Sequence, residues 1–552
     1  MAARIYDLLV IGAGIHGANV AWDAALRGLD VALVDKGDFV SGNSANTLKI
    51  VHGGLRYLQQ VDLPRMRRSI NERKILMRSA PHLVRPLPCL TPTYRSPTKS
   101  RLALRLALAI NDLIGFDRNR GADPSKRIPS GRILSRNECL RMIPGLDDRG
   151  VTGGALWYDA RMHNSERLVL SIIKSAVRAG ADAANYVEAA GLLTEGGRVV
   201  GMRARDLLSG DEFDIRAGVV VNACGPRLDD VIALVLGRQR ERRIKLSTAF
   251  NLVVNRPLVT EAAAGFRSSF EFERPGGAGG RGSRMLFAVP WRGRTLVGTR
   301  HAPLDCEPGE FRISEEQIAD FLEEVNRALP GAKIERHEVT FHLWGIVPMD
   351  GLQPKNGEVI LSKRPRILDH GRGEGIDGLI SLVGVKSTTA RAVAERTVDL
   401  ACRKLGFEPP RCGTAKAAVA GGEIERFDEF LEAEIEKKPH SLNAEVTRHL
   451  VYTYGSDYAE ILDYIDEEPE WGRTAPGSSE ILMAEVVHGV REEMAVKLAD
   501  VVLRRTELGS AGHPGKPCLE ACAAAMAAEL GWDEAGMKRE IDEVQEIYSP
   551  VF

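Results

Sequence analysis

Residues 6–35 constrain the fold more than any other part of the chain. The apolar run YDLLVI (residues 6–11) leads directly into the glycine-rich turn GAGIHG (residues 12–17). Residues 18–28 then carry small and apolar side chains at helical spacing, and a second apolar run ends at Asp35. Strand, glycine turn, helix, strand and acid therefore follow one another as in a dinucleotide-binding βαβ unit.

Each of these positions has a physical role in holding a dinucleotide. Gly12 permits the tight turn, Gly14 lets a pyrophosphate approach the backbone, and Gly17 lets helix and strand pack closely. The helix that begins near Ile15 offers free N–H groups and a partial positive charge. We expect Asp35 to accept hydrogen bonds from ribose hydroxyls, which favours NAD or FAD over NADP. The motif alone does not separate NAD from FAD.

Composition narrows the classes of protein that fit. A chain of 552 residues predicts two or three domains. The 74 Lys and Arg balance 75 Asp and Glu, so the basic excess of a nucleic-acid-binding protein is absent from the sequence. The eight cysteines show no CxxC spacing, and we predict reduced thiols and no metal site. We find no pattern of a signal peptide or of a membrane-spanning segment, and we expect a cytoplasmic protein.

A polar loop and a seven-residue motif follow the βαβ unit. Residues 41–49 are rich in small hydroxyl and amide side chains and end in Lys49, so they form either a phosphate-binding segment or an ordinary polar loop. Residues 52–58 read HGGLRYL. The motif resembles the FAD-dependent glycerol-3-phosphate dehydrogenases of the D-amino-acid-oxidase-like superfamily, whose segment contains the same seven residues.

Further segments resemble the same family in the same order. They are VVVNACGP (219–226), FAVPW (287–291) with LVGT (296–299), VGVKSTTAR (383–391), and the C-terminal stretch from VREEM (490–494) to LRRT (503–506). The resemblance covers nearly the whole chain and implies FAD as the cofactor. It also implies oxidation of glycerol 3-phosphate or a related polyol phosphate at a secondary alcohol, with hydride passing to flavin N5 and electrons passing to quinone or oxygen. An enzyme of hydroxy acids or amines, or a flavoprotein that only transfers electrons, is the alternative.

The resemblance implies a discontinuous arrangement of domains. We expect a Rossmann-like FAD-binding domain in residues 1–85, 150–240 and 345–405, and an antiparallel-sheet substrate domain in residues 86–149 and 241–344. Residues 406–422 are the expected linker to an α-helical domain in residues 423–552, so the class is α/β plus α. Residues 273–283 are too rich in glycine for us to expect regular structure.

The expected catalytic set combines a base, cations for the phosphate, and groups near the flavin. Its members are His52, Arg56, Tyr57, Arg300, His301 and Lys386. Arg56 is the best anion ligand because its planar fork matches phosphate oxygens, with a structural salt bridge as the alternative. Lys386 would stabilise charge near flavin N1 or orient the substrate. His52 is either the base or a flavin contact, unless it is a buried, hydrogen-bonded histidine. Tyr57 either adds a hydroxyl contact or is packed.

The expected FAD contacts come from six segments of the chain. They are Gly12, Gly14, Ile15, Gly17, Asp35, Ser41, Ser44, Thr47, Lys49, His52, Gly53, Gly54, Val187, Ala223, Gly225, Gly384, Lys386, Ser387 and Thr388.

The substrate pocket departs from the family pattern at several positions. The family's S-G-V-R-P-L reads WGIVPM here (344–349), so Val347 stands in place of an expected arginine. Asn251 stands in place of an expected histidine. The family's G-T-T-D reads GTRH here (298–301), so Arg300 and His301 replace its last two residues. Leu48 stands where the family has Ser or Thr before the lysine. Arg300 and His301 are candidates to restore the positive charge, as are residues 363, 364 and 366, which are Lys, Arg and Arg.

Residues 101–110 (RLALRLALAI) predict an apolar helix flanked by basic residues. Such a helix either lies on an anionic membrane surface or packs in the core of the substrate domain. A peripheral contact with the inner face of the membrane is therefore a second possibility for location. A homodimer is compatible with the sequence, which does not specify the oligomeric state.

Overall fold

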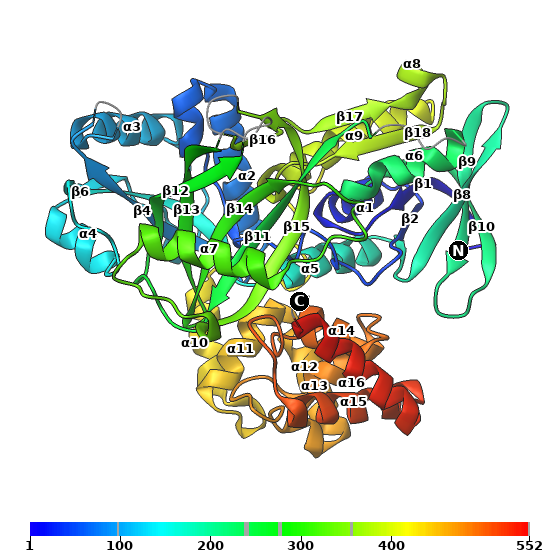
Figure 1. The fold of residues 1–552 in the computed structure, drawn as a ribbon. Coiled ribbons are helices and arrows are strands. Elements are labelled where there is room, and N and C mark those ends of the chain that lie inside the picture. The colour runs from blue at the N-terminus through cyan, green and yellow to red at the C-terminus, as the bar shows by residue number, and fades with distance from the viewer. Residues whose placement is uncertain (97–98, 237–241, 274–278, 354–356, 550–552) are drawn as a thin grey trace.

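The computed structural model describes residues 1–552 except 97–98, 237–241, 274–278, 354–356 and 550–552. Two large β-sheets lie side by side, and a helical domain packs beneath them (Figure 1). This arrangement confirms the predicted class, α/β with an antiparallel-sheet region and a C-terminal helical domain. None of the helices in the described part of the chain has the length and apolar character needed to cross a membrane.

The first sheet is built around the predicted βαβ unit. Its strands, in spatial order, are β17 (Arg366–Asp369), β18 (Leu379–Val383), β10 (Glu212–Asn222), β1 (Ile5–Ile11), β2 (Val31–Val34) and β7 (Asp182–Ala184), with β9 (Arg198–Asp206) and β8 (Val187–Glu195) attached through β10. The strands from β18 to β7 are parallel, and β17 is antiparallel to β18. Parallel strands need cover on both faces, and the nearly fully apolar β1 and β2 meet that need.

Three helices cover one face of this sheet, and a hairpin covers the other. α1 (Ile15–Leu26), α5 (Ser165–Arg178) and α9 (Ala390–Lys404) pack together over Leu8 and Val10. On the opposite face, β8, β9 and α6 (Leu228–Leu236) enclose Leu9 and Ile11. Alternate residues of β1 therefore enter two separate cores, which holds the glycine turn after β1 in place.

The second sheet is mostly antiparallel. Its strands, in spatial order, are β16 (Val359–Leu361), β15 (Val339–Leu352), β11 (Lys245–Val254), β14 (Arg294–Pro303), β13 (Gly279–Trp291), β12 (Ala263–Glu273), β4 (Val84–Tyr94), β6 (Val151–Met162) and β3 (Ile50–Val51), with β5 (Arg132–Leu134) beside β6. Helix α7 (Glu315–Ala328) packs on one face, where the rings of Phe250 and Phe321 lie 5.3 Å apart.

The sheets divide the chain differently from the expected domain boundaries. β6 lies in the second sheet although residues 150–240 were assigned to the first, because β4 pairs with β6 along its whole length. β15 and β16 likewise extend the second sheet beyond residue 344. In the glycine-rich segment, residues 274–278 lie outside the described residues, but β13 already begins at Gly279, so regular structure covers part of the expected loop.

The C-terminal domain consists of helices that form two apolar cores of their own. They are α10 (Phe427–Lys437), α11 (Ala444–Tyr454), α12 (Ala459–Glu467), α13 (Met483–Arg491), α14 (Leu498–Asp500), α15 (Lys516–Leu530) and α16 (Glu534–Tyr548). The segment after α14 continues as a π-helical turn, Val501–Arg505.

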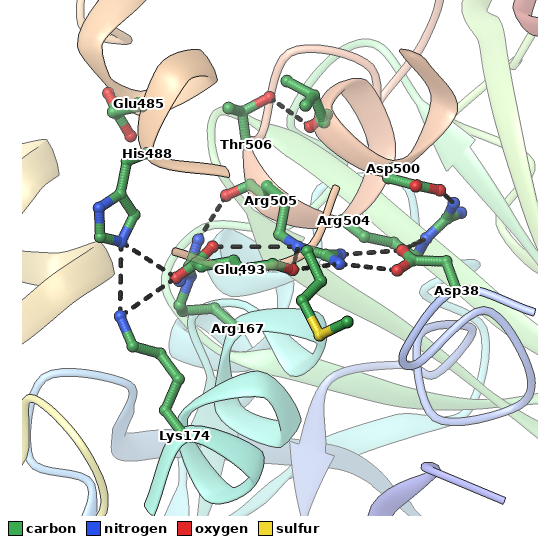
Figure 2. Close-up of polar contacts among 12 residues, drawn as sticks. Asp38, Arg167, Lys174, Glu485, His488, Glu493, Asp500, Arg504, Arg505 and Thr506 are labelled. Atoms are coloured by element: carbon green, nitrogen blue, oxygen red, sulfur yellow. Dashed lines mark hydrogen bonds and ion pairs between the residues drawn. The ribbon is translucent and has the colours of Figure 1, made fainter. Parts of the chain in front are cut away.

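Buried ion pairs fasten this domain to the first sheet. Arg505 forms a bidentate pair with Asp38, which follows β2, at 2.7 and 2.8 Å (Figure 2). Arg167 of α5 pairs with Glu493, which also lies within 3.5 Å of Lys174 (Figure 2). Asp38, Glu493 and Arg505 are nearly fully buried, so each charge depends on its partner.

Helix α3 (Arg101–Ile114) lies on the surface. Only Leu108 is buried, whereas Leu102, Leu106 and Leu113 are 79%, 62% and 74% exposed. Leu104 and Leu108 pack on the core of the second sheet, so one face of the helix is packed and the other is exposed.

Candidate active site

The glycine turn after β1 has the geometry of a dinucleotide cradle. Gly12 has φ +106°, and a Cβ there would lie 2.8 Å from the carbonyl oxygen of Ala223. A Cβ on Gly17 would overlap the carbonyl oxygen of Gly12. Helix α1 begins at Ile15 with Gly14 as its N-cap, and Gly14 has no side chain that could cap the helix. Ser44 Oγ accepts from the Ile15 N–H. Because a helix N-terminus favours an anion, this end of α1 is the expected place of a pyrophosphate.

Asp35 follows β2 at the edge of this cradle. Its Oδ2 accepts a hydrogen bond from the Ala13 N–H at 2.7 Å, and its Oδ1 accepts one from Gly37 at 2.9 Å. Burial raises the pKa of Asp35 to about 6, in spite of these two backbone donors. A ribose diol would supply the further donors that a buried carboxylate requires. Cradle and acid together fit the adenosine and pyrophosphate of FAD.

Several other expected cofactor residues surround this end of the site. The Val187 N–H donates to the Asp35 carbonyl oxygen at 2.8 Å, which places the start of β8 beside the acid. Ala223 N–H donates to the Ile11 carbonyl oxygen at 2.8 Å, and Gly225 begins the next turn with φ +58°. These backbone contacts bring three chain segments together around the turn after β1.

The polar loop 41–49 contributes differently from what we expected. Ser44 Oγ accepts from the Ile15 N–H at 2.9 Å, at the start of α1. Thr47 Oγ1 accepts from the Lys49 N–H at 3.0 Å, so its contact is local. Ser41 lies next to Gly37, where an added Cβ would be 2.9 Å from the Ser41 Oγ. The loop therefore supports the cradle at two places, beside Gly37 and at the N-terminus of α1.

Lys49 points into the protein. Its side chain is 2% exposed, and its ammonium donates to Glu166, to Ser165 Oγ at 2.7 Å and to the Ala45 carbonyl oxygen at 2.8 Å. Its three donors are thereby occupied, which corrects the expectation of a phosphate contact. A buried lysine with an ion-pair partner fastens the loop to α5 instead.

The turn after β18 closes the other end of the site. Thr388 Oγ1 accepts from the His52 N–H at 3.2 Å, which joins the turn at residues 384–388 to the motif at residues 52–58. A Cβ on Gly384 would overlap the ring of His16, so glycine is required there. Ser387 begins a short 3-10 turn that leads into α9. The two family motifs thus meet although they are far apart in the chain.

His16 is a site residue that the sequence reasoning missed. It occupies a variable position of the glycine turn, and its Nε2 is buried without a hydrogen-bond partner among the described residues. Burial lowers the pKa of His16 to about 4, so the ring is neutral. Its position against Gly384, between the glycine turn and the turn after β18, suits a contact with the middle of FAD.

Cationic and hydroxyl groups gather where these motifs meet. Lys386 donates to the Tyr57 hydroxyl, and its ammonium lies 4.6 Å from the centre of the Tyr57 ring. Tyr57 is buried, so it is both packed and hydrogen-bonded. Arg56 is exposed and forms no ion pair with any of the described residues. The salt-bridge alternative for Arg56 is therefore wrong, and its guanidinium is available to an anion.

His52 has a partner that the sequence reasoning missed. Its Nδ1 lies 3.5 Å from Asp159 Oδ2, and its side chain is 46% exposed. Asp159 is buried on β6, where its Oδ1 accepts from the Gly53 N–H at 2.6 Å and from Arg73 at 3.1 Å. Burial alone would raise the pKa of Asp159, but His52 and Arg73 hold it below its usual value. The carboxylate therefore orients the imidazole and the Gly53–Gly54 turn.

The side chains of Arg300 and His301 lie in different environments. Arg300 donates to the Gln317 carbonyl oxygen at 3.2 Å and lies 3.5 Å from Asp320, so it packs on α7. His301 is largely buried, and burial lowers its pKa to about 4, with Arg56 among the charges that lower it further. His301 thus lies near the Arg56 cluster, whereas the expectation for Arg300 is corrected.

The structure explains one of the departures from the family pattern. Asn251 Oδ1 accepts from the Thr299 hydroxyl at 2.8 Å and leaves no room for a Cβ on Gly298, so it supports the β11–β14 pairing. Val347 pairs with Ser247 between β15 and β11. Arg364 is 81% exposed near Asp62, and Lys363 is exposed. Arg366 lines a separate cavity, so no contact ties these three residues to the site.

Comparisons with known proteins agree with this geometry. Residues 7–400 match the family described as FAD dependent oxidoreductase, and residues 412–537 match the C-terminal domain of alpha-glycerophosphate oxidase. A glycerol-3-phosphate dehydrogenase from Synechocystis sp. is 31% identical over 98% of this chain and 96% of its own length. An aerobic glycerol-3-phosphate dehydrogenase from Staphylococcus aureus is 28% identical over 91% of this chain and 86% of its own length.

A solved structure shows the same fold. The glycerol-3-phosphate dehydrogenase from Bacillus halodurans complexed with FAD has a TM-score of 0.76 and 27% identity, covering 100% of this chain and 97% of that one. Match, identity and cradle geometry lead to one assignment: the chain binds FAD and belongs to the FAD-dependent oxidoreductases, among the glycerol-3-phosphate dehydrogenases.

Proposed function

We propose that the protein oxidises sn-glycerol 3-phosphate, or a closely related polyol phosphate, at its secondary alcohol. The observation that carries this proposal is the unpaired Arg56 beside the Lys386–Tyr57 contact at the flavin end of the cradle. Lys386 binds the Tyr57 hydroxyl, and Arg56 directly precedes Tyr57 in the chain. Two such cations suit a phosphate better than an uncharged polyol. The substrate named for the Synechocystis and Staphylococcus relatives agrees with that chemistry.

The residues of the site would have two roles, which are binding of the phosphate and transfer of the hydroxyl proton. Arg56 and Lys386 would bind the phosphate, with neutral His301 as a further hydrogen-bonding group. His52 would accept the hydroxyl proton at Nε2, because Asp159 lies on the Nδ1 side of the ring. When bound, FAD supplies the hydride acceptor at N5. Quinone or oxygen is the proposed final electron acceptor.

Anaerobic reduction of the bound flavin tests the substrate. The FAD-loaded protein is mixed with glycerol 3-phosphate without oxygen, and the oxidised flavin absorption is followed. Prompt bleaching at a rate that saturates with substrate is expected. A flavin that stays oxidised with glycerol 3-phosphate and other polyol phosphates, but bleaches with a hydroxy acid or an amine, would overturn the proposal. Reoxidation by a soluble quinone against oxygen then identifies the acceptor.

We also propose that α3 and its neighbourhood contact an anionic membrane peripherally. Support comes from the exposed Leu102, Leu106 and Leu113 on a helix with Arg101 and Arg105, and from Phe116, which is 79% exposed just after it. Apolar side chains next to cations are typical of helices that lie in a lipid interface. Such a contact would bring the flavoprotein to membrane quinone.

Vesicle sedimentation tests the membrane contact. The protein is expected to sediment with vesicles that contain anionic lipid, and the variant L102S/L106S/F116S is expected to remain in solution. L207S/L208S/F407S is the matched control, because Leu207, Leu208 and Phe407 are also exposed but lie away from α3. Equal sedimentation of both variants would contradict the proposal.

A further inference from the structure

A cavity of about 820 Å³ lies at the outer edge of the first sheet. It is lined by β17, by the short helix α8 (His370–Glu374) and by the C-terminal part of α9. None of its lining residues belongs to the glycine cradle or to the cluster of Arg56 and Lys386. The cavity is therefore distinct from the flavin and substrate sites.

The lining carries an excess of positive charge. Five arginines contribute to it, namely Arg243, Arg366, Arg372, Arg396 and Arg403. Within the described ranges, no carboxylate lies within ion-pair distance of Arg366, Arg396 or Arg403, and all three are exposed. Guanidinium groups that converge on a cavity without partners favour an anion with several oxygens.

The carboxylates of the lining neutralise only part of this charge. Asp369 lies 2.6 Å from Lys404, which stands outside the lining, and 3.4 Å from Arg372. Asp399 lies 2.6 Å from Arg27, whose side chain is buried. Both acids are thus engaged by cations outside the lining as well, and Arg366, Arg396 and Arg403 keep the cavity positive.

Glu374 competes with a ligand for another arginine of the cavity. It pairs with Arg243, whose Nη2 is buried without a hydrogen-bond partner among the described residues. Glu374 Oε2 also lies 2.7 Å from His370 Nδ1, and His370 Nε2 lies 2.8 Å from Ser381 Oγ. A ligand oxygen that reached Arg243 would satisfy the unpartnered nitrogen and weaken the hold on Glu374.

We propose that this cavity binds a small anion with two or more adjacent phosphate groups, such as a nucleoside diphosphate, and that this anion competes with Glu374 for Arg243. The volume lies in the range of nucleotide-sized ligand sites. Ile367, Leu368 and Leu400 give the cavity an apolar wall beside its cationic one. The proposal does not depend on the substrate of the flavin site.

Calorimetric titration of the FAD-loaded protein tests the site, with pyrophosphate, ADP and citrate as the probes. Pyrophosphate and ADP are expected to bind saturably at one site per chain. The variant R366Q/R396Q/R403Q should bind them at least about thirtyfold more weakly, because each charge-assisted contact typically contributes about tenfold or more. Its FAD content is expected to stay unchanged, since the three side chains are exposed.

The matched control removes the same charge elsewhere. R127Q/R448Q/R539Q replaces three exposed arginines outside the cavity and should bind pyrophosphate within about twofold of the parent protein. Equal weakening in both triple variants, citrate binding as tight as pyrophosphate, or no saturable binding would overturn the proposal.

The competition with Glu374 has a test of its own. E374Q removes the carboxylate that holds Arg243 and is expected to bind pyrophosphate several-fold more tightly than the parent protein. Unchanged or weaker binding by E374Q, with the FAD content intact, would contradict the competition.

Discussion

The ammonium of Lys386 donates to the hydroxyl of Tyr57, although 329 positions separate the two residues in the chain. Lys386 follows β18, the last strand of the first sheet in the chain. Tyr57 lies in the 3-10 turn η1 (Leu55–Gln60), which directly follows the residues HGG (52–54). The contact therefore depends on both motifs folding around the same site. A change to either side chain is expected to shift the other.

Arg56→Gln tests the phosphate ligand. Loss of a charge-assisted contact typically costs about 1.5–3 kcal/mol, so kcat/KM for glycerol 3-phosphate is expected to fall roughly ten- to a hundredfold. Steady-state kinetics with an artificial electron acceptor measure this change. Arg300→Gln is the matched control and should leave kcat/KM nearly unchanged, because Arg300 packs on α7. Equal losses in both variants would place the phosphate elsewhere.

Asp159→Asn tests the orientation of His52. The amide keeps the shape but loses the charge beside Nδ1, so kcat is expected to fall about tenfold or more while FAD stays bound. A merely structural role of Asp159 would lower the Tm and leave kcat per bound FAD unchanged.

FAD binding is expected to depend on pH through Asp35. Burial raises the pKa of Asp35 to about 6 in the protein without FAD, and ribose donors would favour the ionised form. The affinity for FAD should therefore rise as the pH increases through about 6 and level off above about 7. Quenching of FAD fluorescence on titration with apoprotein measures it. Asp35→Asn should bind more weakly and lose this pH dependence, and a retained dependence would point to another group.

Asp38→Asn tests the junction with the C-terminal domain. Burial alone would raise the pKa of Asp38, but Arg505 and Arg504 together lower it to about 2. Its stabilising contribution is therefore present above about pH 4 and lost as the pH falls toward 2.

At neutral pH, Asp38→Asn leaves buried guanidinium groups unpaired and is expected to cost about 3–5 kcal/mol. Differential scanning calorimetry should show a clearly lower Tm. Asp147→Asn, which breaks an exposed pair with Arg149, should change the Tm little. Similar shifts in both variants would mean that the junction contributes little to stability.

Local spacing was sufficient to predict the cradle. Gly12, Gly14, Gly17 and Asp35 belong to one βαβ unit, so their relative positions depend on a few consecutive turns. The Rossmann-like part of the fold class followed for the same reason. The resemblance supplied the substrate domain and the helical domain, and it placed Tyr57 and Lys386 in the expected catalytic set without predicting their contact. The place of β6 in the second sheet, and not in the expected first sheet, depends on its pairing with β4. No local sequence pattern specifies that pairing.

The partners of buried charges could not be predicted in this way. Lys49 was expected at a phosphate because its loop is polar, but Glu166 lies 117 positions away and takes its ammonium. Asp159 follows the apolar run of residues 155–158 in β6, and a carboxylate at that place was the available signal for a buried partner. The signal indicates that a partner exists, while the identity of His52 and Arg73 requires the tertiary structure.

The order in which the chain enters the two sheets limits both hinge motion between them and their separation by proteolysis. The backbone passes from the first sheet to the second after β2 and after β10, and it returns after β6 and after β16. Hinge motion between two parts of a protein needs few connections between them. Because the chain crosses between the two sheets four times, we expect the sheets to move as one body. A single cleavage near residue 422 would accordingly divide the chain between the two sheets and the helical domain, whereas no single cleavage divides it between the first sheet and the second.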